Sequence, residues 1–258
     1  MLFAVDVSNT HTAFGVFRGA ELVHEFRVES AKGRTADETH VLLVGLLEME
    51  GLSARQISGA VIASVVPGLT EPMVAACTRA FGQAPMVVGP GTRTGMPILY
   101  ESPREVAPDR IVNALAAYER ARSGVIVVDF STATIFDCIS PKGEYLGGVI
   151  APGIRIAAEA LFTRAARLSR VPISRPERVI GTNTEAAMQS GIVFGYVGLV
   201  DGLVDRIQAE LGFPARVYAT GSTASPVAEA CARIDEVLPH LTLEGLRLVF
   251  ERNVISPR

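Results

Sequence analysis

The sequence predicts an α/β protein with a duplicated core. The predicted elements run as three strands, a helix, a strand, a helix and a strand, and much the same order returns in the second half of the 258 residues. The segments Val5–Thr12 and Val128–Ile135 also look like copies of one motif, because in each an Asp follows an apolar run and precedes small hydroxyl residues. Each segment therefore predicts a strand, a tight polar turn and a second strand.

Composition narrows the class of protein. Hydrophobic residues make up 48%, which is enough for substantial cores, and the net charge of −3 without a basic block argues against a nucleic-acid surface. The sequence has no uninterrupted run of about 18 apolar residues, so we expect no membrane span. The first residues have the pattern of a strand rather than of a signal peptide. Three scattered cysteines fit a reducing cytoplasm. The four histidines show no metal-ligand spacing, so we expect surface or loop positions for them.

Apolar runs in the first half predict five strands, over residues 2–7, 12–17, 21–28, 59–66 and 86–88. Helical periodicity predicts three helices, over residues 35–50, 70–81 and 110–122. Thr35 with Glu38 three residues later predicts the capped start of the first helix, and Pro67-Gly68 is expected to stop the fourth strand. Residues 89–108 are irregular, and loops of this length inside a compact domain are usually functional.

The second half predicts a return hairpin over residues 143–148, a short strand at 149–150, a helix over 154–166 and a loop over 169–182. A long helical stretch covers 183–211, with the possibility of an interruption, and is followed by a strand at 216–220 and a helix at 242–251. The helix at 110–122 leads into the second Asp turn, so we expect the domain boundary there, giving domains 1–115 and 116–258.

Four glycines in the long helical stretch share one face, at Gly191, Gly195, Gly198 and Gly202. Each costs about 1 kcal/mol relative to Ala in a helix interior, so something is expected to pack close to them. Two interpretations stay open with equal weight: close packing on the chain's own sheet, or a subunit interface.

The two Asp turns suit phosphate chemistry. A carboxylate at the end of a buried strand can hold a cation or its water shell, and the turn after it supplies backbone N–H groups and hydroxyls to phosphate oxygens. Two such turns in one chain suggest two related domains that close on one nucleotide.

Several segments in order resemble the type III pantothenate kinases, which belong to the acetate-and-sugar-kinase/Hsp70/actin superfold. They are Asp6-Val7 with Asn9-Thr10, Ala63–Pro67, Asp109–Asn113, Val128–Phe130 with Thr132–Thr134, Gly147–Gly153, Asn183-Thr184 with Ala187–Gly191, and Leu241–Asn253. The resemblance covers almost the whole chain. It implies duplicated actin-like (ribonuclease H-like) domains with mixed sheets flanked by helices. It also implies transfer of the γ-phosphate of ATP to the 4′-hydroxyl of pantothenate, the first step of coenzyme A synthesis. A homodimer, Mg²⁺ with ATP, and K⁺ or NH₄⁺ are implied as well, with no nucleic-acid or membrane partner.

The resemblance also assigns roles to residues. Asp109 would accept the proton of the pantothenate hydroxyl, and Arg110 would pair with a carboxylate or phosphate. The expected pantothenate contacts are Tyr100, Ala107, Pro108, Asp109, Arg110 and Thr184. The expected nucleotide contacts are Asp6, Val7, Ser8, Asn9, Thr10, His11, Thr12, Ala13, Thr132 and Gly221. Asp6 would hold the Mg²⁺ that comes with ATP, and Asp129 the monovalent cation.

Each of these residues also has a purely structural interpretation. Asp6 could cap its turn, and Asp109 could be the N-cap of the helix at Arg110. Arg110 could be a surface charge on that helix, Tyr100 an ordinary loop aromatic, and Thr184 a helix cap.

The sequence departs from the family pattern inside the expected sites. Family members usually carry Gly at positions 8, 131 and 222, and this chain has Ser at all three. They usually carry Asn at position 11, where this chain has His, and Gly-Ala at positions 107–108, where it has Ala-Pro. A Ser at positive φ would cost about 1 kcal/mol, and Pro108 lacks an N–H. Two alternatives to a working kinase follow. One is a catalytically impaired homologue with a ligand-binding or regulatory role. The other is a kinase or phosphatase of the same superfold that acts on another small alcohol or a polyphosphate.

Overall fold

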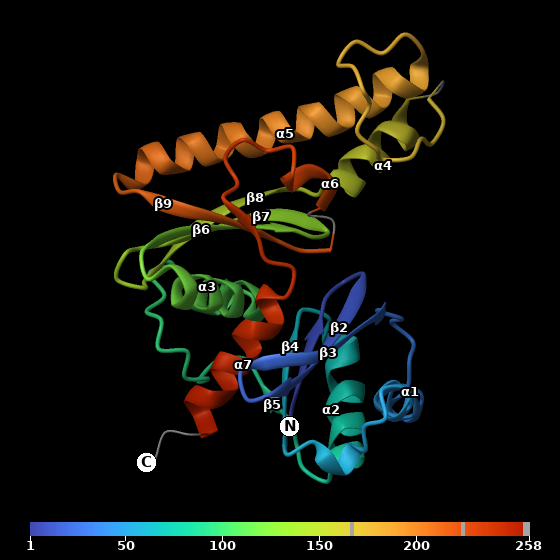
Figure 1. The fold of residues 1–258 in the computed structure, drawn as a ribbon, viewed down its shortest axis with the longest axis vertical. Helices are drawn as coiled ribbons and strands as arrows, with labels where there is room; N and C mark the ends of the chain where they lie inside the picture. Colours follow the sequence, from blue (N-terminus) through green and yellow to red (C-terminus); the bar gives the residue numbers. More distant parts are fainter. Residues whose placement is uncertain (166–167, 223–224, 255–258) are drawn as a thin grey trace. The chain divides into compact units, whose positions relative to one another are not determined.

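The computed structural model describes residues 1–165, 168–222 and 225–254 (Figure 1). The chain forms two compact units. The first contains Met1–Met96, Tyr100–Ala116 and the C-terminal segment from His240, and the second contains Pro97–Leu99 and Ala117–Pro239. The division into domains at residues 115 and 116 stays a prediction.

The first unit is built on a mixed five-stranded sheet with the order β3-β2-β1-β4-β5. Its strands are β1 (Leu2–Val7), β2 (His11–Arg18), β3 (Glu21–Glu29), β4 (Gly59–Ser64) and β5 (Met86–Val87). Its helices are α1 (Ala36–Met49), α2 (Pro67–Phe81), α3 (Pro108–Ala121, which continues into the second unit) and α7 (Leu241–Val254), with short 3₁₀ turns η1 (Ala54–Gln56) and η2 (Pro103–Glu105). β1, β2 and β3 are antiparallel neighbours, and β4 runs parallel to β1.

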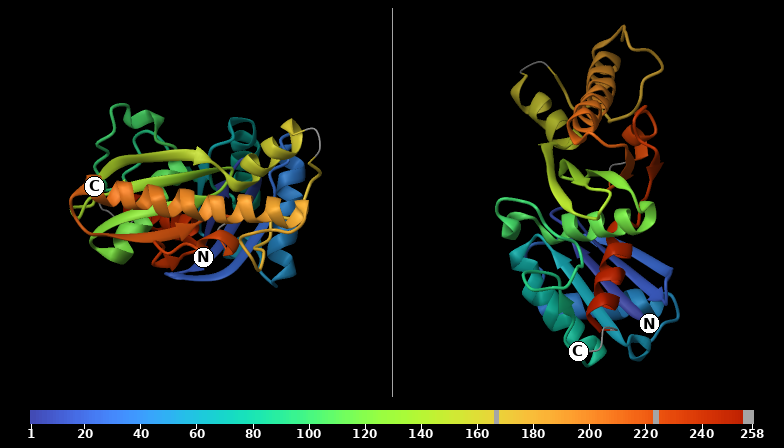
Figure 2. Two further views of the ribbon diagram at one scale, coloured as in Figure 1. Left: turned by 90° about the horizontal axis from the view of Figure 1, so that it is seen from above. Right: turned by 90° about the vertical axis from the view of Figure 1, so that its left-hand side faces the viewer.

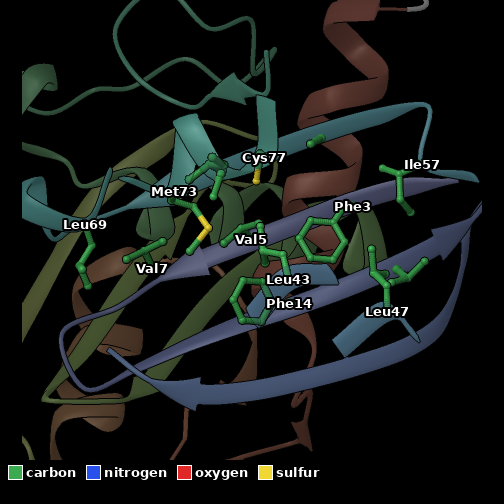
Figure 3. Packing of buried hydrophobic residues seen from close by; sticks show 14 of the residues in the cluster. Phe3, Val5, Val7, Phe14, Leu43, Leu47, Ile57, Leu69, Met73 and Cys77 are labelled. Carbon is green, nitrogen blue, oxygen red and sulfur yellow. The ribbon is translucent and has the colours of Figure 1, made fainter. Parts of the chain in front are cut away.

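Helices α1 and α2 cover one face of this sheet. Phe3, Val5 and Phe14 from the strands pack with Leu43 of α1 and Met73 of α2 in one buried cluster (Figure 3). Helix α7 contacts β1, β2 and β4. Burial of this apolar surface stabilises the sheet and thereby holds the carboxyl end of β1 in place.

Local sequence signals explain how these helices begin. Thr35 and Glu38 form the predicted capping box at the start of α1. The predicted start of the second helix at Thr70 was wrong by three residues, because α2 begins at Pro67. α3 likewise begins at Pro108 rather than at Arg110. Proline is favoured in the first turn of a helix, where its missing N–H has no intrahelical acceptor.

The second unit repeats this architecture with the sheet order β10-β9-β6-β7-β8. Its strands are β6 (Gly124–Phe130), β7 (Ala133–Ile139), β8 (Tyr145–Pro152), β9 (Ala215–Thr220) and β10 (Glu236–Val237). Its helices are α4 (Ile154–Arg164), α5 (Thr184–Leu211) and α6 (Ser225–Ala228). The expected return at 143–148 is a turn as far as Glu144, and from Tyr145 onward it joins the expected strand at 149–150 in the single strand β8. α6 and β10 were not predicted, and the predicted helix end at Ala166 lies outside the described residues.

The duplication is visible in the strand register. Asp6 pairs with Ala13 of β2 and with Ala63 of the parallel strand β4. Asp129 pairs in the same way with Ile135 of β7 and with Thr220 of β9. The two Asp residues therefore occupy equivalent positions in their sheets, although the second turn is one residue shorter.

Helix α5 is one uninterrupted helix that lies along the sheet of its own unit (Figure 2). Tyr196, Val200, Val204 and Ile207 pack against Phe136 and other strand residues in one buried cluster. By length and composition alone α5 could cross a membrane, and 33% of its most apolar window is buried in the protein.

The four glycines of α5 face away from this core. A Cβ atom added at Gly191, Gly195 or Gly198 meets nothing within 4 Å, and one at Gly202 meets only the end of the Arg206 side chain. The interpretation that the glycines allow close packing on the chain's own sheet is therefore wrong.

Candidate active site

The first Asp turn joins β1 to β2 at the carboxyl end of the parallel strands β1 and β4. Asp6 is the last residue but one of β1, and the Ser8 hydroxyl donates a hydrogen bond to its carboxylate at 3.2 Å. Asn9 and Thr10 at the tip are exposed, whereas the Val7 and Thr12 side chains are buried. Asn9 and Thr10 can therefore present both backbone and side chain to a ligand, and Val7 only its backbone.

Asp6 and Asp109 form an electrostatically coupled pair within the first unit. Burial and, after it, the negative charge of Asp109 raise the pKa of Asp6 from 3.8 to about 7, and the hydrogen bond from the Ser8 hydroxyl and the charge of Arg27 oppose this rise. Burial also raises the pKa of Asp109, opposed by a hydrogen bond from the Arg110 N–H and by the Arg110 charge. Two desolvated carboxylates that repel each other form a site that favours a cation.

The first turn of α3 positions Asp109. Pro108 is the first helical residue, so Asp109 lies inside the helix and is not its N-cap. Its Oδ1 accepts the N–H of Arg110 at 2.9 Å, and Arg110 is only 6% exposed. The interpretation of Arg110 as an ordinary surface charge is therefore wrong as well, since a guanidinium this buried needs partners.

Neither serine of the two Asp turns is strained. Among the described residues other than glycine, positive φ occurs at Arg122 alone, so Ser8 and Ser131 adopt conformations open to any residue. The Ser8 N–H donates to His11 O at 3.2 Å, and the Ser131 N–H donates to Ala133 O at 3.0 Å. The strain expected from the missing glycines is absent.

The second Asp turn joins β6 to β7. Asp129 is 9% exposed, and the Thr132 side chain at the tip is exposed. Gly221 has a φ of 101°, and a Cβ there would clash with Phe130 O and with Asp129 Oδ1. Gly221 therefore allows the chain after β9 to pass close to two oxygen atoms of the kind that can ligate a cation.

Two further glycines pack against backbone near the predicted site residues. A Cβ on Gly153 would clash with the carbonyl oxygens of Ser131 and Thr132, and one on Gly245 would clash with Val112 O of α3. Sequence reasoning assigned no role to Gly245, because nothing local shows that α7 packs on α3. Both glycines lie in segments that match the family, Gly147–Gly153 and Leu241–Asn253.

The expected pantothenate contacts are spread over both units. Tyr100, Ala107, Pro108, Asp109 and Arg110 belong to the first unit. Thr184 is the exposed first residue of α5 in the second unit, where Asn183 caps the helix by accepting the Ala186 N–H. The cap interpretation of Thr184 is wrong, and Thr184 instead lines a groove of about 680 Å³ between α4 and α5.

Helix α7 anchors the irregular segment that precedes Tyr100. The Asn253 side chain accepts the Arg93 N–H at 3.1 Å and donates to Arg93 O at 2.9 Å, while the Arg252 guanidinium donates to Thr94 O. The sequence carried no signal for this contact between residues far apart in the chain.

The carboxylates fit a metal ion that arrives with its ligand. In the described ranges no group of three or more His, Cys, Asp or Glu side chains could hold an ion by itself. Mg²⁺ usually binds proteins through one or two carboxylates together with substrate phosphates and waters. Asp6 beside Asp109 meets that requirement, because both are carboxylates and both are desolvated.

Comparison with known proteins finds relatives that share one name. The family model described as type III pantothenate kinase matches residues 2–206. A type III pantothenate kinase from Myxococcus xanthus is 53% identical over 256 residues, which cover 99% of this chain and 100% of the relative. A second from Syntrophobacter fumaroxidans is 47% identical over 258 residues and covers all of both chains.

Solved structures share the fold at low identity. A putative Baf family transcriptional activator from Campylobacter jejuni has a TM-score of 0.61 at 16% identity and covers 98% of this chain and 100% of its own. A ROK hexokinase from Thermus thermophilus has a TM-score of 0.55 at 14% identity and covers 99% of both. The expected actin-like α/β class with two mixed sheets is confirmed.

Proposed function

Because the chain belongs to the type III pantothenate kinase family, we infer that it catalyses the ATP-dependent phosphorylation of pantothenate to 4′-phosphopantothenate. This is the first step of coenzyme A biosynthesis, and the enzyme is a phosphotransferase with an alcohol as acceptor. The observation that carries the inference is similarity over the full chain to enzymes of this name. The coupled, desolvated pair of Asp6 and Asp109 adds a chemical reason, since phosphoryl transfer needs charge neutralisation and an oriented nucleophile.

We propose that Asp109 is the general base. A carboxylate with a raised pKa is a better proton acceptor than an ordinary Asp, and its place in the first turn of α3 fixes its direction. Arg110 follows it in α3, and we propose that its guanidinium pairs with the pantothenate carboxylate or with a phosphate oxygen. Tyr100, Ala107, Pro108 and Thr184 are proposed as the other pantothenate contacts.

ATP is proposed to bind the two Asp turns. The first turn contributes residues 6–13, with the exposed Asn9 and Thr10 nearest the phosphates and the buried Thr12 acting through the shape of the turn. The second contributes Thr132, with Gly221 beside it. Asp6 would hold Mg²⁺ or its waters, and the ion would neutralise the charge that develops on the phosphates. The bound ion would compete with the proton that burial and the charge of Asp109 favour on Asp6.

Asp129 is proposed to bind the monovalent cation, K⁺ or NH₄⁺. Its Oδ1 and the Phe130 carbonyl oxygen both lie beside Gly221, so close that a Cβ atom on residue 221 would clash with them. Oxygen ligands of this kind suit a weakly hydrated cation.

A homodimer is proposed, with the glycine face of α5 at its interface. Gly191, Gly195 and Gly198 are exposed, have no neighbour within 4 Å of an added Cβ, and lie opposite the buried face of α5. The adjoining groove between α4 and α5 is lined mainly by apolar residues such as Leu161 and Leu199. A second copy would bury this apolar surface and allow the close helix approach for which glycine is suited.

The cytoplasm is proposed as the location. The three cysteines are free and buried, which fits a reducing compartment. No nucleic-acid or membrane partner is proposed, because the chain has a net charge of −3 and α5 packs one face on its own sheet.

The impaired-homologue alternative is not favoured by the geometry. Its motive was the loss of glycines and the presence of Pro108, yet Ser8 and Ser131 are unstrained and Pro108 occupies a favoured helix position.

The test is phosphorylation of a panel of alcohols by the purified protein with ATP, Mg²⁺ and K⁺. The panel contains pantothenate, simple sugars and glycerol, and the product is identified by mass. Turnover of pantothenate alone supports the proposal. Turnover of another alcohol supports the other-substrate alternative, and absence of turnover in folded protein that binds ATP supports the impaired homologue.

A further inference from the structure

Ser30 lies directly after β3 and contacts the first Asp turn. Its side chain is 7% exposed, and its hydroxyl donates a hydrogen bond to Ser8 O at 2.6 Å. Its backbone N–H donates to Thr10 O at 3.0 Å. One residue from outside the turn therefore holds two of the turn's carbonyl groups.

The direction of the hydrogen bonds is fixed by proton counting. The Ser30 hydroxyl has one proton and uses it for Ser8 O. The 2.9 Å contact between the hydroxyls of Ser30 and Thr12 must then be donated by Thr12. Thr12 is 2% exposed, so its proton serves this relay and is not available to a ligand.

These contacts set the direction of two backbone donors. The described peptide bonds are trans, and a trans peptide points its C=O and N–H to opposite sides. Ser8 O and Thr10 O both point to Ser30, so the N–H groups of Asn9 and His11 point away from it. These two N–H groups can together donate to one anion, as the backbone N–H groups of turns do in anion-binding concavities.

We propose that Ser30 is a positioning residue for ATP, which holds the Asn9 and His11 N–H groups toward the phosphates. The proposal rests on the proposed function, because it takes the first Asp turn as a phosphate site. Ser30 itself touches no substrate. It acts by keeping the turn preorganised, so that the N–H groups need not reorient when the nucleotide binds.

A structural role alone predicts a different outcome from a positioning role. If Ser30 only closed the end of the β2–β3 ladder, its loss would lower the melting temperature and leave the substrate constants of the folded enzyme unchanged. A positioning role changes the affinity for ATP and spares the affinity for pantothenate.

The experiment measures the Kd of Mg·ATP without pantothenate, and KM for ATP and for pantothenate, in three full-length variants. Ser30→Ala removes the hydroxyl, Ser30→Thr keeps it, and Ser58→Ala is the control. Ser58 also donates to a backbone carbonyl, Met1 O at 3.3 Å, but at the opposite end of the same sheet.

Ser30→Ala is expected to raise Kd and KM for ATP about 3- to 10-fold, as one net hydrogen bond implies. KM for pantothenate should be unchanged, Ser30→Thr should restore ATP affinity, and Ser58→Ala should match the unmodified chain. Unchanged ATP affinity in Ser30→Ala, or equal losses for both substrates, overturns the proposal. Protein that binds Mg·ATP without phosphorylating pantothenate refutes the proposed function, while its Kd values still decide the role of Ser30. Failure to bind Mg·ATP refutes both.

Discussion

At the scale of single residues, the positions that depart from the family pattern carry no backbone strain. Ser8 even gains a role that glycine lacks, because its hydroxyl bonds the Asp6 carboxylate. Pro108 starts α3 without losing an intrahelical hydrogen bond, since the helix bond of this turn runs from the Ile111 N–H to Ala107 O. The sequence could show that these residues were unusual. It could not show their φ angles, which decide whether glycine was needed.

Asp6 should make the stability of the fold depend on pH. Its folded-state pKa of about 7 lies above the ordinary value of 3.8, so the stability associated with the protonated form is lost as pH rises between these values. Asp6→Asn removes this loss. We expect the variant to gain about 1–3 kcal/mol of unfolding free energy relative to the unmodified protein between pH 5 and pH 8, at about 1.4 kcal/mol per pKa unit. Urea unfolding at both pH values measures this.

An equal difference in stability at the two pH values would show that the Asp6 carboxyl is not perturbed. The variant should also lose turnover, because an amide does not replace a carboxylate as a ligand of Mg²⁺.

Gly221→Ala should lower turnover far more than the strain of a non-glycine residue at positive φ would explain. The new methyl group clashes with Phe130 O and Asp129 Oδ1, so turnover and its activation by K⁺ should fall at least about 10²-fold, in the range seen when one preorganised group is lost. Gly212→Ala is the matched control, because Gly212 has a φ of 69° with nothing within 4 Å. It should cost about 1 kcal/mol of stability and leave activity intact. Comparable activity in both variants would remove Asp129 from the proposed cation site.

At the scale of elements, local signals were sufficient where they act within a few residues. The capping box of α1 and the strand–turn–strand order around Asp6 and Asp129 were predicted correctly. The start of α2 was misplaced because Pro67 was interpreted as the end of a strand, and the start of α3 because Asp109 was considered as an N-cap, whereas each proline is the first residue of its helix. The short elements α6 and β10 have too few residues for a periodic pattern.

The glycine face of α5 gives a prediction about assembly. A Cβ atom added at the exposed Gly198 meets no atom of the chain within 4 Å, so the folded chain should tolerate Gly198→Leu, whereas a close helix–helix interface should not. We expect light scattering to show dimers for the unmodified protein and monomers for the variant. Gly45→Leu is the control, since Gly45 of α1 is also a helical glycine with open space around it. A dimer that persists in Gly198→Leu would place the interface elsewhere.

At the scale of the whole molecule, the sequence showed the duplication but not its long-range contacts. The repeated sheet order was accessible because each half carries its own period-2 strands and Asp turn. The sequence could not show that α7 belongs to the first unit, because its partners Arg93 and Val112 lie more than a hundred residues earlier in the chain. Ser30 was missed for the same reason, since nothing near it in sequence points to Ser8.

The monovalent cation should act through the second unit. Turnover of pantothenate should rise when K⁺ or NH₄⁺ replaces Na⁺, and Asp129→Asn should abolish this response, because the carboxylate supplies the charge that holds the cation. The initial rate in chloride salts at one ionic strength measures the effect. A full K⁺ response in Asp129→Asn would count against the assignment.

The proposed mechanism depends on Asp109, which accepts the proton of the pantothenate hydroxyl. The measurement that tests it most directly compares turnover of pantothenate and the Kd of Mg·ATP in the unmodified protein and in Asp109→Asn. We expect Asp109→Asn to lower turnover about 10²–10⁴-fold, the range of general-base catalysis, while ATP still binds. Turnover that survives the substitution, in a variant shown to be folded, would contradict it.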